Sequence, residues 1–162
     1  MNYINNAEDK ILTYFKNHKI PNYFYLCFFG ELIKMFGANI IIPDKRAAQI
    51  NDKVLKISSG GFVNMNICKI PSIQVAIEKL KKNNFWIYAS CISENAQTYF
   101  ETQYNFPLAL IVGNEAKGIS STIKKASDQL IYIPMNGTVQ SLNVSIATAI
   151  LLFDIVKKVH NI

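Results

Sequence analysis

Short apolar runs alternate with amphipathic segments along most of the chain. From residue 39 onward the runs are rich in β-branched and aromatic side chains, which is typical of buried strands. They are "NIIIP" at 39–43, "FWIYAS" at 85–90, "LALIVG" at 108–113 and "QLIYIP" at 129–134. The pattern predicts a strand at each of these positions.

The amphipathic segments between the strands open with residues that can cap a helix. A serine hydroxyl accepts a hydrogen bond from the first free amides of a helix, so three segments are predicted to be helical. They are "SIQVAIEKLKKNN" from Ser72, "SENAQTYFE" from Ser93 and "SSTIKKASD" from Ser120. A short helix is also predicted over residues 5–18. Apolar residues at helical spacing after Ser141 predict a last helix that begins near that serine.

Because strand and helix take turns, the pattern predicts an α/β fold with a mostly parallel sheet and helices on both faces. A length of 162 residues suits one domain. In such sheets ligands bind at the carboxyl ends of the strands. Three of these ends run into polar or glycine-bearing loops, "ASCISEN", "GNEAKGIS" and "PMNGTVQS". We therefore expect a ligand site where these loops meet.

The composition and the length of the apolar runs indicate which partners and which cellular compartment to expect. The net charge of +6 favours polyanions such as RNA, although Arg46 is the only arginine. The apolar run at 23–30 is too short to span a bilayer, which predicts a protein of the cytoplasm with no membrane partner. Cys27, Cys68 and Cys91 form no C-x-x-C pair, so reduced, buried thiols are expected.

Several kinds of chemistry lack their motifs. Neither G-x-x-x-x-G-K-[ST] nor G-x-G-x-x-G occurs, which argues against those nucleotide cradles. His18 and His160 are the only histidines and have no carboxylate cluster beside them, so we expect no metal.

The amino end of the last helix favours an anion or an oxygen-rich ligand, and Gly137 would let the loop approach it closely. An ordinary helix cap explains Ser141 equally well.

Two segments carry a family resemblance. "LALIVGNEAKGIS" at 108–120 and "IPMNGTVQSLNVSIATAILLF" at 133–153 resemble the second and third motifs of the SpoU (TrmH) family of RNA ribose 2'-O-methyltransferases. The likeness is closest to the branch that methylates a guanosine of large-subunit ribosomal RNA. "FGANIIIPDKRAAQINDKVLKISSGG" at 36–61 resembles the segment that follows the first motif in that branch. The likeness covers residues 36–158.

The resemblance implies an enzyme that methylates a ribose 2'-hydroxyl of RNA, most simply ribosomal RNA. It implies a carboxyl-terminal trefoil knot, a homodimer and S-adenosylmethionine as cofactor, with a short divergent segment 1–35 packed on a knotted domain 36–162. The cofactor-binding positions would be Ala89, Gly113, Ile133 and Leu142. The catalytic positions would be Glu115, Ser141 and Asn143, and the RNA-binding positions Lys45 and Arg46.

The first motif departs from the family pattern. An ungapped alignment puts Tyr25 where the family has an asparagine and Glu31 where it has the arginine that is thought to activate the ribose hydroxyl. A glutamate accepts protons but repels phosphates, and Lys34, one helical turn further, is a candidate substitute. Glu31 is otherwise an ordinary surface residue. The alternative hypothesis is therefore a catalytically impaired homologue that acts as an RNA-binding or assembly protein.

Overall fold

A parallel sheet forms the centre of the molecule. The computed structural model describes residues 23–26, 40–43, 67–113, 118–138 and 141–160. Its strands are β1 Tyr23–Leu26, β2 Ile40–Pro43, β3 Ile67–Ile70, β4 Trp86–Ser90, β5 Gln97–Thr98, β6 Leu108–Val112 and β7 Gln129–Tyr132. They lie in the order β3-β2-β1-β6-β4-β7-β5, and each neighbouring pair is parallel. The described helices are α4 Ile73–Lys82, α5 Ser121–Ala126 and α6 Val144–His160.

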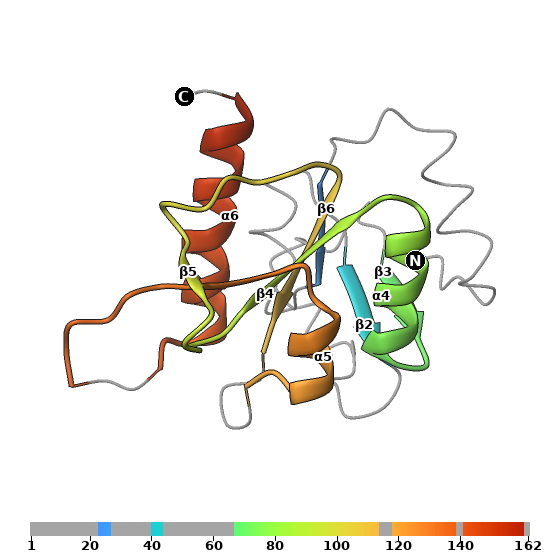
Figure 1. Cartoon of the computed structure of the whole chain (residues 1–162), viewed down its shortest axis with the longest axis horizontal. Helices are drawn as coiled ribbons and strands as arrows, with labels where there is room; N and C mark the ends of the chain where they lie inside the picture. Colours follow the sequence, from blue (N-terminus) through green and yellow to red (C-terminus); the bar gives the residue numbers. More distant parts are fainter. Residues whose placement is uncertain (1–22, 27–39, 44–66, 114–117, 139–140, 161–162) are drawn as a thin grey trace, which may run out of the picture.

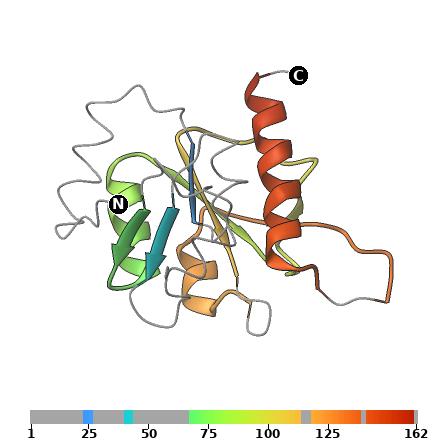
Figure 2. The ribbon, with the colours of Figure 1, turned by 180° about the vertical axis from the view of Figure 1, so that it is seen from behind.

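Helices cover both faces of this sheet. In Figures 1 and 2, α6 lies on one side and α4 and α5 lie on the other. Successive strand residues point to opposite faces, so neighbours along one strand enter different cores. The core under α6 includes Tyr88, Leu108, Leu110, Leu151, Leu152 and Ile155. The core under α4 and α5 includes Ile77, Leu80, Ile87, Ala89, Ala109 and Ile111. The predicted α/β fold with a parallel sheet is thus confirmed.

The serine caps predicted for two of the helices are confirmed. The Ser72 hydroxyl accepts a hydrogen bond from the Val75 amide at 3.3 Å, and α4 begins at the next residue. Ser120 accepts in the same way from the amide of Ile123 at 3.4 Å and starts α5. Each hydroxyl satisfies an amide that has no partner within the helix, which fixes where the helix begins.

The helix predicted from Ser93 is wrong. The chain makes a turn there and then forms β5, a two-residue strand that pairs with β7 at the edge of the sheet. The Tyr99 amide continues this pairing by donating to the Tyr132 carbonyl at 3.0 Å. Pairing of Gln97 and Thr98 with β7 outweighs the local helix signal of the serine.

The last turn of α6 holds this edge segment in place. The Lys158 ammonium lies 2.8 Å from the Asp154 carboxylate and 3.0, 2.9 and 3.0 Å from the backbone oxygens of Tyr99, Phe100 and Thr102. It also lies 5.2 Å from the centroid of the Tyr104 ring. The Lys158 ammonium on α6 therefore serves Asp154 and three backbone oxygens of the β5–β6 connection.

A second polar link stands on the other side of the sheet. The Asp128 carboxylate, just before β7, accepts hydrogen bonds from the Lys81 ammonium at 2.6 Å and from the Ile87 amide at 2.8 Å. The Asp128 amide in turn donates to the Ile87 carbonyl at 2.8 Å. These contacts join the end of α4 to the start of β4 and β7.

Some elements have no counterpart in the sequence analysis, and some predictions lie outside the described residues. The sequence pattern did not reveal β1 and β3, whereas the strands predicted at 39–43, 85–90, 108–113 and 129–134 correspond to β2, β4, β6 and β7. The predicted helix over residues 5–18 lies outside the described part. Within that part, no helix has the length and apolar character needed to cross a membrane.

Candidate functional site

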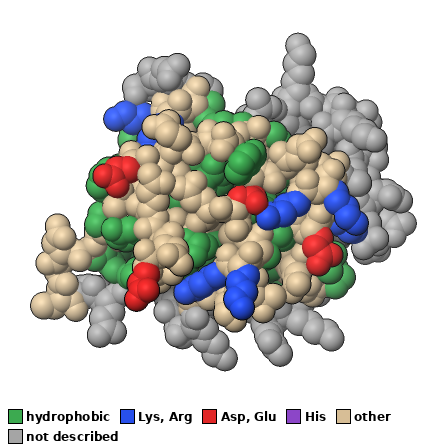
Figure 3. Space-filling view, in the orientation of Figure 1, with side chains coloured by type: hydrophobic (Ala, Val, Ile, Leu, Met, Phe, Trp, Pro, Cys, Tyr) green, Lys and Arg blue, Asp and Glu red, His purple; other side chains and the backbone are tan. Residues whose placement is uncertain are grey.

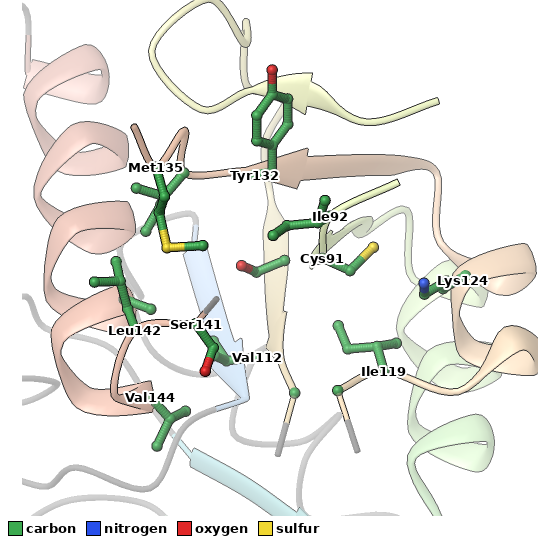
Figure 4. Close-up of a pocket in the computed structure, with 15 residues that line it drawn as sticks. Cys91, Ile92, Val112, Ile119, Lys124, Tyr132, Met135, Ser141, Leu142 and Val144 are labelled. Carbon is green, nitrogen blue, oxygen red and sulfur yellow. The ribbon is translucent and has the colours of Figure 1, made fainter. Parts of the chain in front are cut away.

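A pocket lies at the carboxyl ends of β4, β6 and β7, where the three predicted loops meet. Figure 4 shows side chains from all three loops and from α5 and α6 around it. The pocket encloses about 280 Å³, which is close to the lower end of the usual range for small-molecule sites. It is lined by Ser90, Cys91, Ile92, Val112, Gly113, Gly118, Ile119, Lys124, Tyr132, Ile133, Met135, Ser141, Leu142, Val144 and Ala147. A pocket therefore lies where the ligand site is expected.

The loop after β4 contributes Ser90, Cys91 and Ile92. The Cys91 amide donates to the Ile131 carbonyl at 2.9 Å, which holds the start of this loop beside β7. Burial raises the pKa of the Cys91 thiol, and the nearby Lys124 charge opposes this with a smaller effect. The thiol is therefore protonated at neutral pH, so it is a poor nucleophile. Cys68 and Cys91 are free thiols, as expected, but both are half-buried.

The loop after β6 depends on a close approach of two backbone segments. A Cβ atom added at Gly113 would lie 2.7 Å from the carbonyl carbon of Gly118 and 2.9 Å from the Ile119 side chain. Gly118 itself has a φ of +59°, a backbone conformation that residues other than glycine rarely adopt. The two glycines thus let the chain leave β6 and return to α5 beside the pocket.

The segment from β7 to α6 forms the opposite wall. Tyr132, Ile133 and Met135 follow β7, and Ser141 and Leu142 precede α6. Figure 4 shows the Met135 and Leu142 side chains on the α6 side of the pocket.

The helix α6 begins at Val144, and the Asn143 carbonyl accepts its first bond from the Ala147 amide at 3.0 Å. Asn143 therefore takes the N-cap position, and Ser141 lies two residues before it in the pocket wall.

The structure brings together four of the residues that the resemblance singled out. Gly113, Ile133, Ser141 and Leu142 all line the pocket. Ala89 is fully buried inside the sheet, one residue before the lining begins. Asn143 is exposed and adjoins the lining without belonging to it. Glu31, Lys34, Lys45, Arg46 and Glu115 lie outside the described residues.

Sequence reasoning did not single out Lys124 as a lining residue, and it included Cys91 and Ile92 only as part of the first loop. The exposed Ile92 side chain, with 66% of its surface accessible, gives the pocket mouth an apolar rim. From the sequence, Lys124 looks like part of a solvated helix face beside Lys125. The turn before α5 brings it to the pocket. Gly137 is not among the lining residues, and a Cβ there would meet no protein atom within 4 Å, so its close approach to a ligand stays a prediction. The described residues hold no group of three His, Cys, Asp or Glu side chains placed to bind a metal.

Comparison with known proteins identifies the family of this chain. The SpoU rRNA Methylase family matches residues 31–153. RlmB of Yersinia pestis, a 23S rRNA (guanosine-2'-O-)-methyltransferase, is 34% identical over 119 residues, which make up 74% of this chain and 48% of RlmB. The chain spans about half the length of the curated relatives it matches.

Solved structures share the fold. The TrmH/SpoU tRNA modifying enzyme of A. aeolicus superposes with a TM-score of 0.76 and 27% identity, covering 94% of this chain and 84% of that one. AviRb from Streptomyces viridochromogenes, a SpoU methyltransferase solved in complex with AdoMet, gives a TM-score of 0.74 with 18% identity over 90% of this chain and 62% of its own.

The parallel sheet, its two helical layers and the pocket at the strand ends are therefore those of an RNA methyltransferase fold. The chain belongs to the SpoU rRNA Methylase family. This confirms the resemblance found in the two sequence motifs.

Proposed function

We propose that this chain binds S-adenosylmethionine in the pocket and methylates a ribose 2'-hydroxyl of ribosomal RNA in the cytoplasm. The observation that carries the proposal is the meeting of Gly113, Ile133, Ser141 and Leu142 around one pocket in a chain of the SpoU family. The relative named as a 23S rRNA (guanosine-2'-O-)-methyltransferase supports the reaction and the RNA. The AdoMet complex of AviRb supports the cofactor.

The described lining suits such a ligand in its chemical character. Ile133, Leu142 and Val144 offer an apolar surface against which an adenine ring can lie. Gly113, at the end of β6, brings the backbone into the pocket lining, where a ligand can approach it. S-adenosylmethionine, when bound, supplies an electrophilic methyl group on a positively charged sulfur.

The side chains at the start of α6 would then position the reactants. Ser141 lies in the pocket wall, where its hydroxyl can donate to or accept from a bound ligand. Asn143, at the N-cap of α6, would fix the path of this wall and contact the RNA from its exposed side. Holding the ribose in line with the methyl group accounts for much of the acceleration. A base must also accept the ribose proton, and Glu115 is the catalytic position of the second motif that the resemblance implies.

We further propose the trefoil knot and the homodimer that the family resemblance implies, with residues 36–162 as the knotted domain and 1–35 packed on it. Ile146 and Phe153, seven residues apart on α6, are 52% and 63% exposed. Residues at this spacing share a helix face, and a second copy of the chain is the partner that would cover it. Light scattering should give twice the 18.3 kDa of one chain.

For RNA binding we propose Lys45 and Arg46, in the segment that follows β2. On the face shown in Figure 3, the coloured lysine side chains lie among acidic ones across the surface. A mixed surface of this kind attracts a phosphate backbone less than a continuous basic strip does. A basic strip after β2 would therefore complement the described face.

The test combines binding and transfer. The purified protein is titrated calorimetrically with S-adenosylmethionine and then incubated with radiolabelled cofactor and ribosomal RNA, whose digested nucleosides are analysed for 2'-O-methylation. We expect binding of one cofactor per chain and transfer that falls at least roughly tenfold in Ser141→Ala and Asn143→Ala. Ser121→Ala, exposed on α5 and outside the pocket lining, is the matched control.

Each outcome has a distinct meaning. If the cofactor fails to bind even at millimolar concentration, the proposal is overturned. Binding without transfer to ribosomal RNA would instead favour the alternative hypothesis, a catalytically impaired homologue. The ungapped alignment that puts Glu31 at the position of the first-motif arginine raises this alternative.

A further inference from the structure

The described lining of the pocket carries a single charge. Among the lining residues that the structure describes, Lys124 is the only lysine, and none is an arginine, aspartate or glutamate. It lies on α5, whose short helix follows the close approach of Gly113 and Gly118. Figure 4 places its nitrogen on the same side of the pocket as Cys91 and Ile119, across from Met135 and Leu142. The pocket thus has an uncharged wall and a wall with one cation.

The surroundings of Lys124 call for an anion. Its side chain is half-buried, and no hydrogen bond or ion pair joins its ammonium to another residue of the described part. The second lysine of α5, Lys125, is exposed. Partial burial of an ammonium costs free energy, and an anionic ligand would offset this cost where the described residues provide no partner. The effect of Lys124 on the Cys91 thiol agrees with its position beside the pocket rather than in open solvent.

The proposed cofactor has one group of the required charge. S-adenosylmethionine carries positive charge on its sulfur and on its amino group, and only its carboxylate is negative. If the adenine lies against Ile133 and Leu142, the methionine part would extend toward the opposite wall. Repulsion would keep the Lys124 ammonium away from the sulfur and the amino group, whereas attraction would bring the carboxylate to it.

We propose that Lys124 binds the carboxylate of the methionine part of S-adenosylmethionine and so determines how tightly the pocket holds the intact cofactor. This inference rests on the proposed function and adds a specificity residue that neither family motif predicts. An ammonium also suits an RNA phosphate, but Lys124 stands in the wall of the small-molecule pocket, so the cofactor carboxylate is the partner that the geometry favours.

The test compares two ligands that differ only in the carboxylate. Calorimetry is performed with S-adenosylmethionine and with decarboxylated S-adenosylmethionine on the wild-type chain, Lys124→Met and Lys124→Arg. Methionine keeps the length and apolar stem of lysine but removes the charge, and arginine keeps the charge. Lys125→Met, one residue along on the exposed face of α5, is the matched control. Circular dichroism checks that each variant is folded.

We expect the wild-type chain to bind the intact cofactor roughly tenfold to a hundredfold more tightly than the decarboxylated one. Lys124→Met should lose that preference by weakening only the intact ligand, whereas Lys124→Arg and Lys125→Met should keep most of it. The inference is overturned if folded Lys124→Met retains the wild-type preference. A loss of RNA affinity alone, with cofactor binding unchanged, would assign Lys124 to a phosphate and also overturn it. If the wild-type chain binds neither ligand, the proposed function fails first.

Discussion

The two sides of the pocket are built differently. The α6 side is uncharged where it lines the pocket, and the charged groups Asp154, Lys157 and Lys158 lie toward the far end of the helix. The α5 side brings Lys124 into the lining and is held by the exposed ion pair of Lys81 and Asp128. One side therefore offers an apolar surface on a firmly anchored helix, and the other offers a charge on a short one.

The difference indicates a division of labour. A long helix whose last turn is bonded to the β5–β6 connection can hold an apolar wall in place, because rigid support keeps a site in its productive geometry. A six-residue helix beside the pocket can present a side chain whose partner is a ligand. Substitutions at the junction of the two sides and at the supports of each side separate these two roles.

Gly113→Ala should have the largest effect, because Gly113 lies where the two sides meet. The new methyl group would stand 2.7 Å from the Gly118 backbone, and a backbone atom cannot rotate away. We expect a loss of about 1–3 kcal/mol in the free energy of unfolding and a roughly hundredfold slower methyl transfer. Urea unfolding and the transfer assay measure the two effects.

Gly137→Ala is the control for this substitution. A Cβ at Gly137 meets nothing within 4 Å, so stability should stay the same or rise by about 0.4–1 kcal/mol through the unfolded state. Equal behaviour of the two variants would show that the close approach of Gly113 and Gly118 does not shape the site.

The supports of the two sides should differ in strength. Lys158→Met removes a half-buried ammonium that serves Asp154 and three backbone oxygens, so we expect a loss of about 2 kcal/mol in the free energy of unfolding. Lys81→Met breaks an exposed pair and should cost less than about 1 kcal/mol. Lys157→Met, exposed beside Lys158, should have almost no effect. Urea titrations compare the variants, and equal losses for Lys158 and Lys81 would remove the distinction.

The smallest effect concerns pH. Burial, together with the nearby Asp154 carboxylate, raises the pKa of Tyr104 above its ordinary value of 10.0. Above that pH the unfolded chain gives up a proton that the folded chain keeps, so stability should fall as pH rises, by up to about 1.4 kcal/mol per pH unit for this residue. Tyr104→Phe should reduce the fall between about pH 9 and about pH 11 in urea titrations. An identical slope in both proteins would contradict the assignment.

The sequence predicted the elements whose signals are local. β4, β6 and β7 are near-continuous apolar runs, and Ser72 and Ser120 start their helices by hydrogen bonds within one turn. β5 could not be foreseen, because its pairing with β7 and the contacts of Lys158 join residues far apart in the chain. The order of the strands is non-local for the same reason.

The candidate site divides in the same way. Gly113, Ile133, Ser141 and Leu142 stand in recognisable motifs and gather at the pocket. Lys124 belongs to no motif, and the sequence shows it only as one of two adjacent lysines on a helix. Its place in the pocket follows from the turn that the two glycines allow before α5, which is a property of the folded backbone.

A crystal structure of the chain with bound S-adenosylmethionine tests the central claim most directly. We predict the cofactor at the carboxyl ends of β4, β6 and β7, with adenine against Ile133 and Leu142 and the methyl group directed toward Ser141. A cofactor bound elsewhere, or a pocket closed by its own side chains in the presence of saturating cofactor, would contradict the account.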